Sequence, residues 1–240
     1  IVTGAASGIG LATTNLLIEA GAFVAAVDYK GHENLPSIDA LLPVRCDVSD
    51  LSQVKSAVAA VLEKWGHIDV LVNNAGVMDN FAGVDDTSDA MWQRCMKINL
   101  DGVFFFSREC FPHLIVHPNH KGAIVNVASV ACKLGSMSGA AYTASKHAVI
   151  GLTKNTAKHN KGKLTCNVVL PGATLTNIFD SLVGGRDAID PYGQSVGQTL
   201  DAMRPKDFVQ PEDVARAILF LAFNPMVNGA VLEVDNGWTA

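Results

Sequence analysis

The sequence predicts an α/β protein built on one doubly wound parallel β-sheet with helices on both faces. Apolar runs of strand length recur along the chain, at 23–27, 42–46, 68–72, 123–128, 164–170 and 230–234. They alternate with segments of helical length and pattern, of which 52–65 and 213–223 are the clearest. Such alternation is typical of parallel strands joined by right-handed crossovers, which gather the ligand-binding loops at one rim of the sheet.

Length and composition favour a single domain that spans residues 1–240. A chain of 240 residues fits one large domain or two small ones, and no repeat, charge block or low-complexity stretch marks a boundary. No apolar run approaches the roughly 18 residues that a membrane span needs, so we expect no membrane association. The net charge of −5 comes without a basic stripe, which argues against nucleic acid as a partner.

The cysteines indicate a reducing compartment. Their number is odd, their positions (46, 95, 110, 132 and 166) are widely spaced, and no Cys-x-x-Cys pair occurs. No secretory signal is visible, and Ile1 leaves so short a first strand that we expect further residues upstream. The expected location is therefore the cytoplasm.

A glycine-rich turn follows the first strand-like residues, with glycines at positions 4, 8 and 10 before a helical pattern. Glycine lets the backbone approach a phosphate, and the helix that follows presents free N–H groups and the positive end of its dipole. The spacing differs from the general dinucleotide pattern, so the turn alone is a loose match. Asp28 ends the next strand, where dinucleotide folds place a ribose-binding acid; a solvated turn aspartate is the alternative.

Tyr142 and Lys146 stand four residues apart, and Ser129 precedes the tyrosine by thirteen. Residues four apart on a helix share a face, so the ammonium would lie near the phenol and lower its pKa from the usual value of about 10. A tyrosine of that kind can act as an acid or base near neutral pH. If the pair stood alone, an amphipathic tyrosine on a surface helix would explain it equally well.

Taken in order, the motifs resemble the short-chain dehydrogenase/reductase family over essentially the whole chain. They are the TGxxxGIG turn at 3–10, Asn73-Asn74-Ala75-Gly76, Asn99, Ser129 and the Tyr142/Lys146 pair. The resemblance implies a Rossmann-like sheet of about seven strands in the order 3-2-1-4-5-6-7. It also implies an oxidoreductase that transfers a hydride between NAD(H) and a secondary alcohol or ketone. Family members are often homotetramers or homodimers, here formed through the helix of Tyr142 and a helix near 100–117.

The resemblance assigns four catalytic residues. Tyr142 would exchange a proton with the substrate oxygen, while Lys146 would lower the tyrosine pKa and bind the nicotinamide ribose. Ser129 would polarise the substrate carbonyl, which is electrostatic help and not nucleophilic attack. Asn99 would hold a water that extends the proton path; an asparagine within a helix has poor propensity, which supports a purpose.

The same resemblance implies an NAD site along the rim, with NADP less favoured because Asp28 would repel a 2′-phosphate. Ser7 and Tyr29 stand where NADP users often carry a basic residue, although Lys30 is a nearby cation. The expected cofactor-binding residues are Gly4, Ser7, Gly8, Ile9, Gly10, Asp28, Asp47, Val48, Asn74, Ala75, Gly76, Tyr142, Lys146, Pro171, Gly172 and Thr176.

Some of these residues have structural alternatives. Asp47 stands near the start of a helix, so capping that helix is the alternative to its role in cofactor binding. Asp50 and Ser49 are, however, better placed as caps. The Asn73-Asn74-Ala75-Gly76 stretch has a largely structural alternative, which is to tie down the rim of the sheet. Thr176 could equally cap a helix.

A long irregular region, 174–210, is expected to form a substrate loop or lid, because loops of this length in compact domains are usually functional. Its apolar residues hint at a ring or acyl substrate, and its paired glycines would let it close. The residues that carry this expectation are Phe179, Leu182, Val183, Gly184, Gly185, Tyr192 and Met203.

Three other functions were weighed from the sequence. A 3-oxoacyl-[acyl-carrier-protein] reductase shares the implied catalytic set, but those enzymes mostly prefer NADPH, against which Asp28 counts. A non-catalytic NAD(H)-binding sensor or scaffold can lose the tyrosine or lysine, and this chain retains both. Hydrolase chemistry is disfavoured because the Gly-x-Ser-x-Gly turn is missing.

No metal is expected: His113, His117 and His120 lack a nearby carboxylate or cysteine partner.

Overall fold

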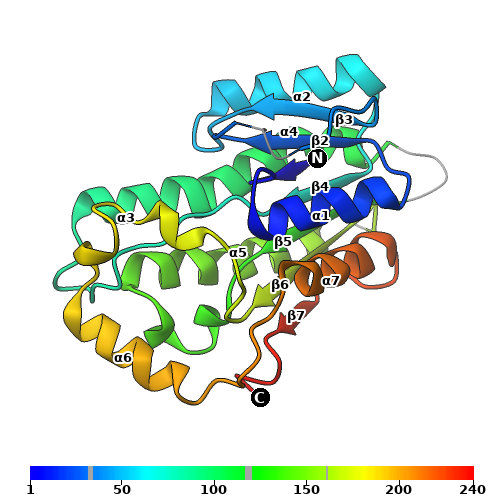
Figure 1. Cartoon of the computed structure of the whole chain (residues 1–240). Helices are drawn as coiled ribbons and strands as arrows, with labels where there is room; N and C mark the ends of the chain where they lie inside the picture. The colour runs from blue at the N-terminus through cyan, green and yellow to red at the C-terminus, as the bar shows by residue number, and fades with distance from the viewer. Residues whose placement is uncertain (32–34, 117–120, 161) are drawn as a thin grey trace.

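The computed structural model describes residues 1–31, 35–116, 121–160 and 162–240. Among them a seven-stranded sheet has the order β3-β2-β1-β4-β5-β6-β7, and every neighbouring pair is parallel (Figure 1). The expected strand order is therefore confirmed. The strands are β1 (Val2–Thr3), β2 (Val24–Asp28), β3 (Leu41–Arg45), β4 (Val70–Asn73), β5 (Gly122–Val127), β6 (Leu164–Pro171) and β7 (Val231–Val234).

Helices cover both faces of this sheet, because successive side chains of a strand point to opposite sides. In β5, Ile124 packs with α2 (Leu51–Trp65) and α4 (Gly102–Leu114), whereas Val125 packs with α1 (Gly8–Glu19) and α7 (Pro211–Phe223). A third cluster brings Val149 of α5 (Ala140–His159) against the residues of β6. The central strands are thus apolar on both faces.

Two helical segments lie on the side of the molecule away from β2 and β3. The helix α3 (Asp89–Met96) continues through one π-helical turn, η1 (Lys97–Asp101), into α4. Farther along the chain, α6 (Pro191–Asp201) lies at the lower left of Figure 1. Both segments belong to the part of the fold that borders the candidate site.

The 174–210 region is more regular than the sequence predicts. It contains two 3-10 turns, η4 (Ile178–Ser181) and η5 (Arg186–Ala188), before α6. The start of α6 has a clear local cause: the Asp190 side chain accepts a hydrogen bond from the Gly193 amide, and proline occupies the first helical position. Two glycines inside the helix lower its helix propensity, which explains why the sequence predicts an irregular region here.

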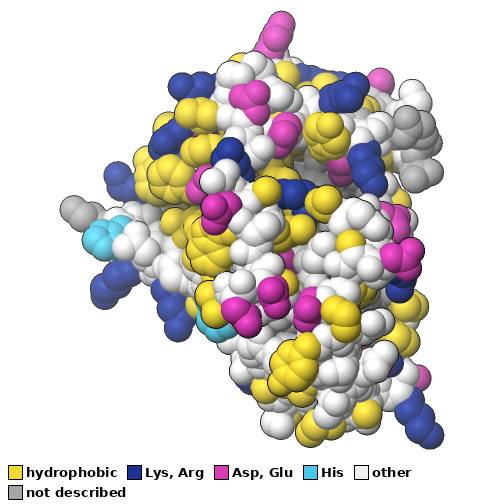
Figure 2. All heavy atoms as spheres, turned by 90° about the vertical axis from the view of Figure 1, so that its left-hand side faces the viewer, with side chains coloured by type: hydrophobic (Ala, Val, Ile, Leu, Met, Phe, Trp, Pro, Cys, Tyr) yellow, Lys and Arg dark blue, Asp and Glu magenta, His cyan; other side chains and the backbone are white. Residues whose placement is uncertain are grey.

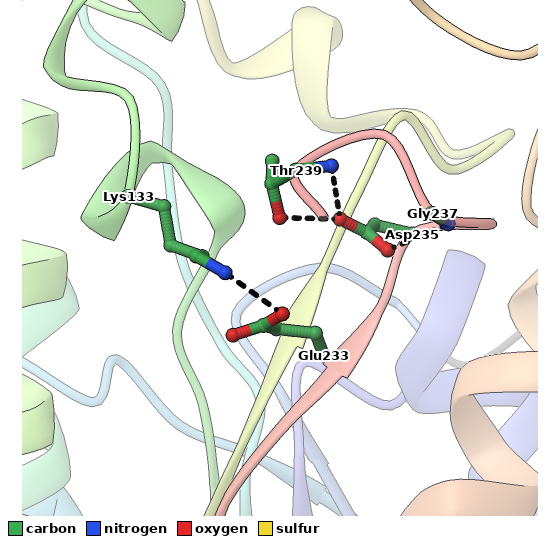
Figure 3. A network of polar contacts seen from close by, with 5 residues as sticks. All are labelled: Lys133, Glu233, Asp235, Gly237 and Thr239. Atoms are coloured by element: carbon green, nitrogen blue, oxygen red, sulfur yellow. Dashed lines mark hydrogen bonds and ion pairs between the residues drawn. The ribbon is translucent and has the colours of Figure 1, made fainter.

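The turn that follows β7 is fixed by a carboxylate. Asp235 accepts hydrogen bonds from the Gly237 and Thr239 amides and from the Thr239 hydroxyl, at 3.0, 2.9 and 2.6 Å (Figure 3). One residue pair beside it, Lys133 and Glu233, forms an ion pair of 2.9 Å that joins β7 to the turn after β5. The Asp235 hydrogen bonds and the Lys133–Glu233 ion pair therefore both stabilise the edge of the sheet at β7.

Within the described ranges, no helix combines the length and the apolar character needed to cross a membrane.

Candidate functional site

The expected cofactor residues lie along the carboxyl-terminal rim of the sheet, beginning with the glycine turn between β1 and α1. Gly4 and Gly8 have φ values of +66° and +52°, which residues with a side chain rarely adopt. A Cβ on Gly10 would collide with the Gly4 carbonyl oxygen. The glycines therefore let the turn and the helix pack directly against each other.

This turn suits an anionic group. Ser7 stands at the N-cap of α1 but makes no capping hydrogen bond with its side chain, and the first turn of the helix contains no acidic residue. Amide groups at the helix start therefore remain available, and the positive end of the helix dipole is not neutralised. The residues present thus fit the pyrophosphate of a dinucleotide.

Asp28 connects the end of β2 to the same turn. Its carboxylate accepts hydrogen bonds from the Ala6 amide and the Lys30 amide, both at 2.9 Å. An ionised carboxylate has about four acceptor positions, so two more donors such as ribose hydroxyls can still be accommodated. The aspartate is therefore hydrogen-bonded to the glycine turn and is not an isolated solvated turn residue.

Asn74 and Ala75 hold β4 against β1. The Thr3 hydroxyl accepts hydrogen bonds from both of their amides at 3.0 Å, and the Asn74 side chain donates to the Thr3 and Gly4 carbonyls. These bonds give Asn74 and Ala75 a structural role at the rim, while the cofactor contacts expected of the stretch stay a prediction. They also set the position of the glycine turn, since Gly4 belongs to it.

Asp50, and not Asp47, caps α2. Its side chain accepts hydrogen bonds from the side chains of Ser52 and Gln53 and from their amides, which together hold its pKa at about 2. The Asp47 carboxylate instead accepts from the Ser49 amide and hydroxyl. Val48 is buried against Gly102. The adenine contact expected of Asp47 and Val48 stays a prediction.

Pro171, Gly172 and Thr176 complete the rim at the end of β6. Gly172 packs so closely on Asp235 that a Cβ would lie 2.7 Å from that residue's Cβ. Thr176 lies against the glycine turn, since a Cβ on Gly8 would be 3.1 Å from the Thr176 Cβ. The threonine also accepts a long 3.4 Å hydrogen bond from the Ile178 amide, so it contributes to the start of η4 as well.

Tyr142 and Lys146 lie in α5, as the spacing predicts, and both are buried. The Lys146 Nζ is 5.6 Å from the centroid of the tyrosine ring and donates to the Val127 carbonyl oxygen at 2.9 Å. Burial lowers the pKa of the lysine to about 8. The ammonium thus binds the end of β5 and lies beside the ring face of the tyrosine.

The expected lowering of the tyrosine pKa is wrong. Burial raises the pKa of Tyr142, and only a hydrogen bond with the Ser129 side chain acts in the lowering direction among the groups around it. Spacing along a helix gives proximity to Lys146 but carries no information on desolvation, which here has the larger effect.

Ser129 is positioned by a short turn after β5. It caps the 3-10 turn η2 (Val130–Cys132), where its hydroxyl oxygen accepts a hydrogen bond from the Ala131 amide at 3.1 Å. The Ser129 side chain also interacts with the Tyr142 phenol, which opposes the rise that burial causes in the pKa of the tyrosine. The two hydroxyl groups expected to contact a substrate oxygen are therefore neighbours.

Asn99 lies in the π-helical turn η1, and such turns occur frequently at functional sites. It is fully buried and bridges three segments: its amide donates to the Val77 carbonyl and the Ser145 hydroxyl, and its oxygen accepts from the Val77 amide. A Cβ on Gly76 would lie 3.2 Å from the Lys146 Nζ and 3.3 Å from the Asn99 Oδ1. Gly76 thus separates the asparagine from the lysine ammonium.

The cysteine thiols are unsuited to covalent catalysis. All five are free, and burial raises the pKa of Cys46, Cys110 and Cys166 to about 12 and that of Cys95 to about 11. Only a thiolate is a good nucleophile. The described residues contain no group of three or more side chains that could hold a metal ion, and His117 and His120 lie outside them.

Comparison with known proteins assigns this arrangement to a family. A model of the short chain dehydrogenases matches residues 1–186. The chain belongs to this family. It is therefore an oxidoreductase, and its fold is one that binds a nicotinamide cofactor.

Other short-chain dehydrogenases align with the full length of the chain. A short-chain dehydrogenase/reductase of Penicillium canescens is 39% identical over 249 residues, covering 100% of this chain and 95% of that protein. A 3beta-hydroxysteroid dehydrogenase of Eggerthella lenta is 36% identical, covering 100% and 94%. A 3-ketoacyl-(acyl-carrier-protein) reductase from Brucella melitensis, solved with NADH, superposes with a TM-score of 0.86 at 28% identity, covering 99% and 96%.

Sequence reasoning missed the residues that hold the short-chain dehydrogenase site in place. The buried Asp79 accepts hydrogen bonds from the Gly139 and Tyr142 amides at 2.9 and 2.8 Å and so fixes the start of α5. Ser145 joins Asn99 to the Tyr142 carbonyl oxygen. Asp79 is about sixty positions from its partners and has no local signal, whereas Ser145 precedes the lysine of the motif directly.

Proposed function

We propose that this short-chain dehydrogenase interconverts a secondary alcohol and a ketone with NAD(H), and that Tyr142 is its general acid and base. The observation that carries the proposal is the convergence of Ser129, Tyr142 and Lys146 at the rim, with Gly76 against the lysine ammonium. NAD, when bound, accepts or supplies the hydride. The remaining task, moving one proton at the substrate oxygen, falls to the side chains of this chain.

The hydroxyl groups of Tyr142 and Ser129 are paired for that task. In oxidation the phenolate form of Tyr142 takes the proton of the substrate hydroxyl, and in reduction the phenol form gives a proton to the substrate oxygen. Ser129, whose side chain neighbours the tyrosine and is anchored through the Ala131 amide, steadies the charge that develops on the substrate oxygen. Lys146 supports the exchange because burial brings its pKa to about 8, so its proton is labile near neutral pH.

Asp28 supports NAD over NADP. Its carboxylate is held at the glycine turn by the Ala6 and Lys30 amides, where it would accept hydrogen bonds from ribose hydroxyls and repel a 2′-phosphate. The proposed cofactor contacts of Asp47, Val48, Pro171, Gly172 and Thr176 belong to the same rim. Asn99 is proposed to hold the water that continues the proton path from the lysine.

A second candidate function is reduction of 3-oxoacyl groups on a carrier protein. It is favoured by the structural similarity to the Brucella reductase, which was solved with NADH, so the preference for NAD does not exclude this class. A non-catalytic sensor or scaffold is less well supported, because the chain retains the complete set of Ser129, Tyr142 and Lys146.

The experiment that tests the proposed function is a screen of NAD reduction with steroid, cyclic, polyol and hydroxyacyl alcohols, repeated with NADP at one fixed substrate. We expect turnover with at least one alcohol and a higher kcat/KM with NAD. Strong preference for NADP would overturn the proposed role of Asp28. No turnover with any alcohol would favour the sensor.

Assembly and location are proposed on separate grounds. We propose a homotetramer or homodimer through α4 and α5, supported by the 42% exposure of Phe104 on α4, where Arg108 stacks on its ring. Sedimentation that gives a monomer would refute this. The five free thiols support a reducing compartment such as the cytoplasm.

A further inference from the structure

Two loops cover the catalytic tyrosine with apolar side chains. Tyr142 is only 6% exposed and belongs to a cluster with Met78, Ala131 and Leu182. Partly buried hydrophobic residues pack around this cluster: Phe81, Met137, Ile178 and Ile189. We call this set of residues, together with Phe179, the apolar wall. The apolar wall therefore packs around the residue that is proposed to meet the substrate oxygen.

Aromatic stacking joins the two loops within the apolar wall. The rings of Phe81 and Phe179 are nearly parallel, with an interplanar angle of 6° and centroids 6.2 Å apart. Arg186 lies over the outer ring, with its guanidinium carbon 5.1 Å from the Phe179 centroid. The charge of Arg186 thus lies over the phenylalanine ring.

Polar side chains near the apolar wall are directed to the main chain. Arg94 donates to the Met78 and Ser181 carbonyls at 3.1 and 2.7 Å, and Ser181 accepts from the Met78 amide and donates to the Ile178 carbonyl. Asn80 donates to the Val183 carbonyl at 3.2 Å. These contacts hold the loops together and use the donors that a polyhydroxylated substrate would need.

Three of the roughly four acceptor positions of Asp79 are occupied in the same way. One carboxylate oxygen accepts from the Phe81 and Gly139 amides and the other from the Tyr142 amide, so all of these bonds serve the protein backbone. A buried hydroxyl without a partner costs about 1–3 kcal/mol. Near the wall, among the described residues, the Asn80 Oδ1 is the buried side-chain acceptor that has no partner, so a sugar or polyol that entered beneath the apolar wall would find few partners for its hydroxyl groups.

Outside the apolar wall the surface is acidic. A pocket of about 340 Å³ beside the wall is lined by Asp86, Asp187 and Asp190 among others. Figure 2 looks onto this side of the molecule and shows carboxylates gathered among hydrophobic side chains. An anionic substrate is disfavoured because the carboxylates that line this pocket are negative, while Arg94 is engaged with main-chain carbonyls and Arg186 lies over the Phe179 ring.

We propose that the apolar wall selects a neutral secondary alcohol or ketone carried on a bulky apolar body, in preference to a sugar, polyol or anion. This inference rests on the proposed function, since Tyr142 sets where the reacting oxygen lies. The apolar body would pack against Leu182 and Phe179 after segment 178–189 shifts to admit it. Each methylene buried there strengthens binding, whereas each additional hydroxyl group weakens it.

A binding experiment with three ketones tests the proposal without turnover, because a ketone and oxidised NAD cannot react. The ketones are 2-decalone, cyclohexanone and a pentahydroxycyclohexanone, and their Kd values are measured by calorimetry on the full chain saturated with NAD. We expect 2-decalone to bind at least about tenfold more tightly than cyclohexanone, and the pentahydroxy ketone at least about tenfold more weakly.

Matched variants locate the effect. Leu182→Asn replaces a wall residue by a polar one of similar size and is expected to remove most of the advantage of 2-decalone, about tenfold. Leu175→Asn changes a leucine that is 52% exposed and outside the apolar wall, and should leave the three Kd values unchanged. If Leu182→Asn does not fold, the order of the three ketones on the natural chain remains decisive.

Three results would overturn the proposal: equal or tighter binding of the pentahydroxy ketone than of cyclohexanone, an unchanged 2-decalone affinity in folded Leu182→Asn, or no binding of any of the three ketones to protein that binds NAD. The proposed function fails on a different observation, which is the absence of alcohol turnover in the cofactor screen. The two failures are therefore distinguishable.

Discussion

The Lys146 ammonium lies 5.6 Å from the centroid of the Tyr142 ring and donates its hydrogen bond to the Val127 carbonyl, at the end of β5. The pair is thus joined across a ring face, while the lysine ties α5 to the sheet. Burial shifts the pKa values of the two groups in opposite directions, upward for the tyrosine and down to about 8 for the lysine. Of these two protons, that of the lysine is the more labile.

The buried lysine predicts a pH dependence of stability. Its pKa of about 8 in the fold lies below the ordinary value of 10.5, so between these values the unfolded chain binds more protons than the folded one. The contribution of Lys146 to the free energy of unfolding is therefore constant below pH 8 and increases from there toward pH 10.5. The gain is at most about 1.4 kcal/mol per pH unit.

Urea denaturation at pH 7, 8 and 9.5 checks this. We expect the difference in unfolding free energy between the natural chain and Lys146→Met to increase by about 1–2 kcal/mol from pH 8 to 9.5. Lys154→Met, which alters an exposed lysine of the same helix, should give a difference that does not change with pH. A flat or falling curve for Lys146→Met would refute the burial effect.

Gly10 is expected to be intolerant of any side chain. Gly10→Ala places a Cβ on the Gly4 carbonyl oxygen, so the glycine turn must move, and we expect NAD affinity to fall at least about tenfold with a loss of about 1–3 kcal/mol in stability. The control is Gly151→Ala in α5, where a Cβ meets nothing within 4 Å. That change should stabilise the protein by about 0.5–1 kcal/mol. Normal NAD binding by Gly10→Ala would contradict the proposed phosphate-binding role of the glycine turn.

Much of the fold could be predicted from the sequence because its signals are local. Strand and helix periodicity, the glycine turn and the cap at Asp50 each lie within a few consecutive residues, and the structure reproduces them. Tyr142 and Lys146 likewise share a helix. Local pattern could not predict how deeply Tyr142 is buried, and this burial reverses the expected shift of the tyrosine pKa.

Contacts between distant segments were also beyond the sequence. Asp79 meets the start of α5 from about sixty residues away, and Arg94 reaches Ser181 from another helix. Their partners are main-chain atoms, which every residue has, so the sequence contains no complementary pair of side chains that would predict these contacts. The helix α6 is a different case: Asp190 and Pro191 do signal its start, but glycines at 193 and 197 mask the helical pattern that follows.

Asp28 is expected to control cofactor choice. Asp28→Asn removes the charge that repels a 2′-phosphate, and we expect the ratio of kcat/KM with NAD to that with NADP to fall at least about tenfold. The substituted amide retains one acceptor oxygen for the Ala6 or Lys30 amide, which limits damage to the turn. Asp39→Asn, an exposed change before β3, serves as the control. An unaltered ratio in Asp28→Asn would remove the basis for preferring NAD.

Arg94 is expected to act as a positioning residue for the apolar wall. Arg94→Met loses both hydrogen bonds that join the Met78 and Ser181 carbonyls, and we expect kcat/KM for the alcohol to fall about tenfold while the KM for NAD changes less than about twofold. Arg94→Lys should recover part of the loss. Arg216→Met on α7 is the matched control, since that arginine is exposed and pairs with Asp213. Equal losses for alcohol and NAD would indicate a general structural role instead.

The central claim, that Tyr142 moves the proton in an NAD-linked oxidation or reduction, is tested most directly by Tyr142→Phe. The measurement is single-turnover rate and NAD affinity on the same preparation, with the alcohol that the screen identifies. The prediction is NAD binding within about twofold of the natural chain and a rate lower by about 10³-fold or more. A rate close to that of the natural chain, with NAD bound normally, would contradict the mechanism.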